Sequence, residues 1–245
     1  EVLTELPDKI EQNMILPFND EEEKIYVANL AKANKKLQEL YDIEGSDKMQ
    51  ILKLLTRLRQ LCLEPRLVYD NIDQPSSKLK ACMELIKTMQ ENKQKVLLFS
   101  SFTSVLDLIA EECQKAGITY YMLTGSTNKE DRRELVSRFQ KDDTTLFLIS
   151  LKAGGTGLNL TSAEVVIHFD PWWNVSAQNQ ATDRAYRIGQ KNNVQVFNLV
   201  MKDSVEEKII ELQKRKKELA DMFVENNNSG LSQMSKEDIL SLFTM

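Results

Sequence analysis

The stretch KVLLFSSFTSVLDLIAEECQKAGITYYML (residues 95–123) sets the pattern of the fold, because it joins two short apolar runs through one amphipathic segment. Short apolar runs bounded by turn residues indicate buried strands, and the same alternation continues downstream. Such alternation is typical of an α/β fold, with a parallel sheet and helices on both faces. We predict strands at 96–99, 120–123, 146–149, 165–169 and 194–200, and helices near 104–116, 128–140 and 175–187.

Two amphipathic helices are predicted ahead of this pattern, at 19–41 and 48–62, because their apolar residues recur every three or four positions. We expect them to form an antiparallel pair. A turn-rich linker at 70–77, which contains Pro75, separates them from the α/β pattern. The remaining helices are predicted at 204–226 and 235–243, which gives an N-terminal segment with a helical insertion (1–75), an α/β lobe (76–203) and C-terminal helices (204–245).

Composition narrows the class of protein. With 42% hydrophobic and 28% charged residues, the chain resembles an ordinary globular protein. The formal net charge of −5 excludes a uniformly basic surface, so any DNA binding must use local patches. We see no signal-peptide pattern and no apolar run long enough for a membrane span. We therefore expect an intracellular protein, in the cytoplasm with the nucleoid if it is bacterial and in the nucleus if it is eukaryotic.

The cysteines and the one histidine suggest structural roles. Cys62, Cys82 and Cys113 show no paired spacing, so we expect reduced, buried thiols and neither a disulfide framework nor a thiolate zinc site. His168 lies within the apolar run VVIHF (165–169), and a buried imidazole is the better interpretation there. No metal site is predicted.

Polar and aromatic residues follow four of the predicted strands. In open parallel sheets, ligands bind beyond the carboxyl ends of the strands. Adjacent exposed tryptophans are costly unless they pack or bind something, so Trp172 and Trp173 leave two alternatives open, a cap on the core and a binding surface. The segments that share the predicted edge are Ser100–Thr103, Thr124–Ser126, Ser150–Lys152 and Asp170–Trp173.

Three glycines, Gly154, Gly155 and Gly157, follow a predicted strand directly. Glycine lets the backbone approach a ligand, and N–H groups in such a loop can face phosphate. Tight-turn packing is an equal alternative. The dinucleotide fingerprint G-x-G-x-x-G fails at Leu160, and no G-x-x-x-x-G-K-[ST] loop occurs in the sequence. The chain therefore lacks a phosphate cradle of its own.

The segment QATDRAYRIGQ (180–190) places Gln180, Arg184 and Arg187 at helical spacing, so we predict that they share one helix face. Two guanidinium groups projecting together suit the negative charge of a phosphoryl group in transfer. The alternative is a solvated surface on which Asp183 pairs with Arg187. For the basic run at 214–217, which lies on a glutamate-rich helix, a solvated face is the default interpretation.

Together these residues resemble the second-lobe motifs of the Swi/Snf family of helicase-like ATPases, and the match covers nearly the whole chain. ISLKAGGTGLNLTSAEVVIHFDPWWN (149–174) resembles motif V and QATDRAYRIGQ (180–190) motif VI, and both are highly specific. The other matches are KVLLFSSFTSVLDLI (95–109) to motif IV, YYMLTGSTNKEDRRELVSRF (120–139) to the following block, LTRLRQLCLEPRLV (55–68) to the helical insertion and VEEKIIELQKRKKELADMF (205–223) to the brace helix.

This resemblance implies a RecA-like lobe that closes on ATP from one side. The first lobe of such enzymes supplies the phosphate loop and the Mg²⁺-binding acidic box, so ATP and Mg²⁺ would be held mainly there. The acidic run Asp20–Glu23 is a helix start and not that box. The implied roles here are arginine fingers for Arg184 and Arg187, a phosphate contact for Gln180, closure contacts to nucleotide for Gly157 and Asn159, and a DNA-tracking edge made by Ser101, Thr124, Gly125, Lys152 and Trp173.

The resemblance also implies partners, namely the first RecA-like lobe of the same protein, double-stranded DNA and a protein complex on that DNA. We expect the chain alone to be a monomer that does not hydrolyse ATP. One alternative is a catalytically silent RecA-like platform that docks DNA or a protein, against which Arg184 and Arg187 both argue. A small-molecule Rossmann enzyme is a weaker alternative, because the fingerprint fails and no acid–base constellation is present.

Overall fold

The computed structural model describes residues 6–41, 48–154, 157–172, 174–222 and 235–244. None of the helices within these stretches is both long and apolar enough to cross a membrane. The contacts divide the chain into two compact units. The first consists of Glu1–Met14 and Leu79–Leu199, and the second of Ile15–Lys78 and Val200–Met245.

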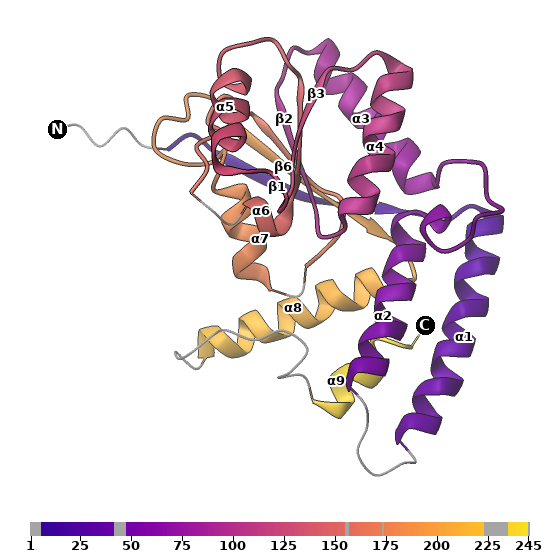
Figure 1. The fold of residues 1–245 in the computed structure, drawn as a ribbon. Coiled ribbons are helices and arrows are strands. Elements are labelled where there is room, and N and C mark those ends of the chain that lie inside the picture. Colours follow the sequence, from indigo (N-terminus) through magenta and orange to yellow (C-terminus); the bar gives the residue numbers. More distant parts are fainter. Residues whose placement is uncertain (1–5, 42–47, 155–156, 173, 223–234, 245) are drawn as a thin grey trace. The chain divides into compact units, whose positions relative to one another are not determined.

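A single six-stranded parallel sheet, in the order β1-β6-β5-β2-β4-β3, confirms the predicted α/β class (Figure 1). The central β2 pairs with both β4 and β5, and β1 lies at the edge beside β6. The backbone N–H of Val194 donates to the carbonyl of Asp8 over 2.9 Å, which ties the start of β1 to β6. The strands are β1 (Lys9–Leu16), β2 (Val96–Ser100), β3 (Tyr120–Leu123), β4 (Leu146–Ser150), β5 (Val165–His168) and β6 (Val194–Met201).

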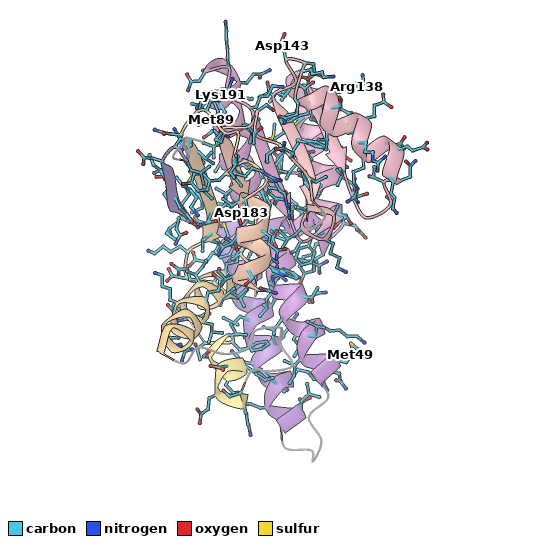
Figure 2. All side chains as sticks on the ribbon, turned by 90° about the vertical axis from the view of Figure 1, so that its left-hand side faces the viewer. Met49, Met89, Arg138, Asp143, Asp183 and Lys191 are labelled. Atoms are coloured by element: carbon cyan, nitrogen blue, oxygen red, sulfur yellow. The ribbon has the colours of Figure 1, made fainter. Side chains whose placement is uncertain are left out.

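Helices cover both faces of the sheet, with α3 and α4 on one face and α5, α6 and α7 on the other (Figure 1). Helix α3 was not predicted, and α7 ends five residues before the predicted 187. Asp183, which follows α7, lies away from Asp143 and Lys191, which precede β4 and β6 (Figure 2). The helices are α3 (Ser77–Glu91), α4 (Thr103–Ala116), α5 (Lys129–Phe139), α6 (Leu151–Gly154) and α7 (Val175–Thr182).

A buried apolar cluster lies between the sheet and α5, α6 and α7. Its aromatic centre includes Phe139 of α5 and Phe147 of β4, whose ring centroids are 5.2 Å apart. A Cβ added at Gly154 would lie 2.8 Å from the Phe99 ring, closer than real Cβ contacts come. Glycine at the end of α6 therefore allows that short helix to approach the sheet.

The second unit is helical. Helices α1 (Asp20–Tyr41) and α2 (Lys48–Leu63) run antiparallel side by side, as predicted, and α8 (Val205–Met222) packs against α2 (Figure 1). Residues 223–226 of the predicted C-terminal helix lie outside the described residues. The short elements of this unit are the 3-10 helix η1 (Pro65–Leu67) and α9 (Lys236–Ser241).

A buried ion pair joins elements of the second unit. Lys78 Nζ lies 2.7 Å and 2.8 Å from the two carboxylate oxygens of Glu206, and both side chains are at most 1% exposed. The Met201 N–H donates to the same carboxylate over 2.8 Å. Burial raises the pKa of the nearby Cys62 thiol, and Glu206 raises that pKa further. The first turn of α8 is thus fixed by charge-assisted hydrogen bonds.

Candidate functional site

The carboxyl ends of neighbouring strands bring the predicted polar segments to one edge of the sheet. Ser100 at the end of β2 is in register with Ser150 at the end of β4, and Leu123 of β3 is in register with Ile149. His168 of β5 is in register with Phe99 of β2. The segments that follow these four strands therefore leave the sheet from one row, as the sequence predicts.

Asp170 joins two of these strand ends. The residue is only 5% exposed, and Oδ1 of its carboxylate accepts hydrogen bonds from the Ser100 hydroxyl (2.7 Å) and from the Ser101 N–H (3.1 Å). The Ser101 hydroxyl donates to the other oxygen, Oδ2. Ser101, a predicted DNA contact, thus directs both its N–H and its O–H toward Asp170, and it shapes the turn after β2.

The other predicted DNA contacts differ from Ser101 in their local structure and exposure. Thr124 begins a tight turn, in which its N–H donates to the Thr127 hydroxyl over 3.1 Å. Gly125 in that turn is exposed, and Lys152 on α6 is exposed close to the end of β4. Trp173 lies outside the described residues.

The predicted shared helix face of Gln180, Arg184 and Arg187 is wrong, because α7 ends at Thr182. Gln180 is exposed on the last turn of the helix, whereas both arginines lie in the turns that follow. After the helix, the backbone of Arg184 pairs with the segment that contains Leu160, whose N–H donates to the carbonyl of Arg184 over 3.0 Å. Tertiary contact overrides the helical periodicity at this point.

Both arginines nevertheless converge on the glycine-rich segment. Arg184 Nε donates to the carbonyl of Gly154 over 3.0 Å, and Arg187 Nη1 donates to the carbonyl of Leu158 over 3.3 Å. Burial lowers the pKa of Arg184, and the neighbouring positive charge of Arg187 lowers that pKa further. Two guanidinium groups of like charge are therefore held near one another by backbone carbonyls.

A buried amide supports this arrangement. Gln190 Nε2 donates to the carbonyls of Ala163 (2.8 Å) and Ala185 (3.1 Å). Its oxygen accepts the N–H groups of the two residues that follow it. Sequence reasoning did not single out Gln190, although Gly189 directly before it was a usable signal of a turn. In the structure Gly189 has a positive φ of +104°.

The remaining predicted nucleotide contacts lie on the glycine-rich segment itself. Gly157 has a positive φ of +38°, and both Gly157 and Asn159 are exposed. Gly155 lies outside the described residues. An arginine that the sequence analysis missed, Arg132 of α5, donates to the carbonyl of Ala153 over 3.2 Å. Arginines from α5 and from the turns after α7 therefore donate to backbone carbonyls at the end of α6 and in the segment that follows it.

His168 is a buried core imidazole, which confirms the structural interpretation. Its Nε2 lies 2.9 Å from the Thr182 hydroxyl, and its ring stacks on Phe99 with centroids 5.7 Å apart. Burial lowers the pKa of His168 to about 4, against a weaker opposing effect of Asp170. The imidazole is neutral at physiological pH, and it ties β5 to α7.

Comparisons with known proteins show which proteins this chain is similar to. Residues 77–189 match the model of the helicase conserved C-terminal domain, a span that includes both arginines. An ATP-dependent helicase of Mycoplasma pneumoniae is 37% identical over 99% of this chain. The ISWI chromatin-remodeling complex ATPase of Saccharomyces cerevisiae is 33% identical, also over 99% of this chain. The chain belongs to the Swi/Snf family of helicase-like ATPases.

Solved structures place the chain within the Swi/Snf architecture. The Sulfolobus solfataricus SWI2/SNF2 ATPase core in complex with double-stranded DNA superposes with a TM-score of 0.78 at 30% identity. The match covers 98% of this chain and 51% of that one. The chain spans 23% of the length of each of the two curated relatives named above. It therefore constitutes a Swi/Snf-type helicase C-terminal lobe, with the RecA-like sheet that the resemblance implied.

Proposed function

We propose that this lobe completes the ATPase site of a double-stranded DNA translocase, with Arg184 and Arg187 as its arginine fingers. The observation that carries the proposal is the convergence of both guanidinium groups on the segment from Gly154 to Leu158. Arginine is always charged and presents a planar fork of donors that matches phosphate oxygens. Two such groups beside a glycine-rich backbone form a surface complementary to a triphosphate.

Preorganisation makes these arginines suitable for catalysis. Each is already held by a backbone carbonyl, so little reorganisation is needed when charge develops on a phosphoryl group in transfer. Arg187 is exposed, and its remaining N–H groups can reach a ligand. Gln180, Gly157 and Asn159 are likewise exposed and would add contacts to the nucleotide as the lobes close.

ATP and Mg²⁺ would be held mainly by a first lobe. The groups that this chain would bring to the nucleotide are guanidinium, amide and backbone groups, which suit phosphate oxygens, whereas Mg²⁺ prefers carboxylates and water. A phosphate loop of the form G-x-x-x-x-G-K-[ST] does not occur in the sequence. We therefore propose that ATP hydrolysis requires a first lobe joined to this one.

The DNA-tracking edge would consist of Thr124, Gly125, Lys152 and Trp173, with Ser101 shaping the turn beside them. Exposed Lys152 would contact the phosphate backbone, and the open turn at Gly125 would let main-chain N–H groups approach it. Such binding is independent of base sequence and weakens with salt. Lobe closure on ATP and its release on hydrolysis would then move this edge along the duplex.

Hydrolysis and DNA binding, measured on the same full-length protein, test the proposal. We expect duplex DNA to stimulate the wild-type ATPase, and Arg184→Ala and Arg187→Ala to abolish turnover while they retain DNA affinity. A wild-type protein that binds DNA without hydrolysing ATP would instead support a silent docking platform. Arginine variants that lose DNA affinity but hydrolyse ATP normally would place the arginines on the DNA.

A further inference from the structure

Helix α7 attaches to the sheet largely through polar contacts. The side chains that it buries are those of Gln178, Ala181 and Thr182, so two of the three are polar. Gln178 Nε2 donates to Oδ1 of Asn198 on β6 over 3.0 Å, and Thr182 contacts His168 on β5. Surface helices usually bury an apolar stripe, whose attraction is not directional. Hydrogen bonds hold this helix in one defined position.

The contact between the buried side chains of Gln178 and Asn198 belongs to a longer polar network that reaches exposed residues of β1. Asn198 Nδ2 donates to Glu11 Oε1 (2.9 Å) and Asn13 Oδ1 (3.0 Å) on β1. On the other side, Gln178 Oε1 accepts the backbone N–H of Trp172 over 3.3 Å. Gln178 is 8% exposed and Asn198 is 4% exposed, so water cannot freely replace the hydrogen bond between these two side chains. All five residues belong to the first unit.

The position of α7 fixes two parts of the proposed site at once. In the sequence the helix begins just after Trp173, which belongs to the proposed DNA edge, and Asn174 caps its first turn. At its other end, the Arg184 N–H donates to the carbonyl of Ala181 over 3.2 Å, so the helix leads directly into an arginine finger. A displacement at the tryptophans would therefore reach Arg184 through a single eight-residue helix.

We propose that Gln178 is a positioning residue that couples DNA binding at the tryptophan segment to the placement of Arg184. It contacts neither DNA nor ATP in this assignment, and it acts through the Trp172 backbone and Asn198. The inference rests on the proposed function, because it needs both a DNA edge and arginine fingers. It adds a specific side chain through which the two communicate.

The variant Gln178→Met tests this role in the full-length protein. Methionine approximates the length and volume of glutamine but makes neither hydrogen bond, so the helix is retained while its directional tie is lost. We expect the ratio of DNA-stimulated to basal ATPase to fall about fivefold to tenfold, as suits the loss of one or two buried hydrogen bonds. The basal rate should stay within about twofold of wild type. Asn179→Ala, at an exposed position of the same helix, is the matched control and should leave the ratio unchanged.

A double-mutant cycle with Asn198→Leu makes the test specific for the network. Because the two side chains share one hydrogen bond, the double variant should lower the stimulation ratio no further than the stronger single variant. Additive losses would contradict a shared path. Thermal unfolding of each variant, followed in parallel, separates coupling from stability.

Three other outcomes would overturn the inference. An unchanged stimulation ratio in Gln178→Met shows that the network carries no coupling. Equal losses of basal and stimulated rates with a lowered melting temperature show that Gln178 only supports the fold. A wild-type protein without DNA stimulation would remove the proposed function and this inference together, whereas a stimulated wild type with an indifferent Gln178→Met removes the inference alone.

Discussion

At the scale of single residues, the proposed chemistry of this lobe depends on two arginines. Arg184 is half-buried and Arg187 exposed, yet both donate to carbonyls of one segment. A guanidinium fixed in this way keeps its planar fork oriented, whereas a lysine ammonium is a point charge on a flexible stem. We therefore propose that catalysis depends on the orientation of the guanidinium fork as well as on its positive charge.

Arg187→Lys in the full-length protein separates charge from geometry. An arginine finger is worth about 10³–10⁵ in rate, or about 4–7 kcal/mol, so we expect lysine at this position to lose most of the turnover. DNA affinity and melting temperature should stay near wild type, because Arg187 is exposed and is not one of the proposed DNA contacts. Steady-state ATPase, DNA binding and thermal unfolding are measured on one preparation.

A surface role for Arg187 predicts a different result. An exposed ion pair contributes roughly 0–1 kcal/mol to stability, so its loss would leave hydrolysis nearly normal. Near-normal turnover by a folded Arg187→Lys protein would refute the finger assignment. Lys141→Ala, which changes an exposed cation far along the sequence, serves as the control for nonspecific charge effects.

The sequence alone singled out both arginines as candidates, but it mispredicted the structure that brings them together. Spacing at i, i+4 and i+7 indicated a helix face, whereas the real convergence depends on Gly154 and Leu158, which lie about 30 residues earlier in the chain. The structural roles of Asp170 and Gln190 were missed for the same reason. Their hydrogen-bond partners are distant in the sequence, and only the fold brings them together. The periodicity of the sequence also gave no sign that α7 ends at Thr182, with Asp183 as its C-cap.

At the level of elements, five strands were predictable and β1 was not. The five carry continuous apolar runs, as strands buried on both faces do. In contrast, β1 reads KIEQNMIL, with most of its residues exposed at the sheet edge, and only its pairing with β6 defines it. Helix α3 had a usable signal in the spacing of Leu79, Cys82 and Met83, and the interpretation of the preceding segment as a linker obscured it.

The tie between β5 and α7 predicts a pH-dependent stability. The pKa of His168 falls from 6.5 to about 4 on folding, because burial disfavours the charged ring. Between these values the unfolded chain binds more protons, so stability should fall as the pH drops from 6.5 toward 4, by roughly 3 kcal/mol for this group alone. Above pH 6.5, His168 should contribute nothing to the pH dependence of the free energy of unfolding.

Denaturant unfolding as a function of pH checks this expectation against His168→Gln, which cannot titrate in that range. The variant should show a shallower fall in the free energy of unfolding between pH 6.5 and 4. Parallel pH profiles for the two proteins would mean that His168 is not the group that titrates.

The buried ion pair of the second unit makes another prediction at this scale. Lys78→Met leaves the Glu206 carboxylate buried without its cation, which typically costs about 3–5 kcal/mol of stability. The double variant Lys78→Met/Glu206→Gln removes the uncompensated charge, keeps an acceptor for the Met201 N–H and should recover much of that loss. Denaturant unfolding midpoints compare the three proteins, and equal stability of the single and double variants would contradict the assignment.

At the scale of the whole molecule, the features that the lobe has and the phosphate loop that its sequence lacks determine the function we propose for it. It combines a parallel sheet with a polar edge, two oriented arginines and a helical second unit, but its sequence contains no phosphate loop. Arginine fingers stabilise charge on a phosphoryl group that another part of the enzyme must hold. We therefore expect the lobe to complete an active site that another part of the enzyme forms.

The central claim is tested most directly by the steady-state ATPase of the 245-residue chain and of the full-length protein, each with and without duplex DNA. We expect the isolated chain to be folded and monomeric yet to show no turnover under either condition, whereas duplex DNA should stimulate hydrolysis by the full-length protein. ATP hydrolysis that persists through purification and follows the isolated chain would contradict the central claim.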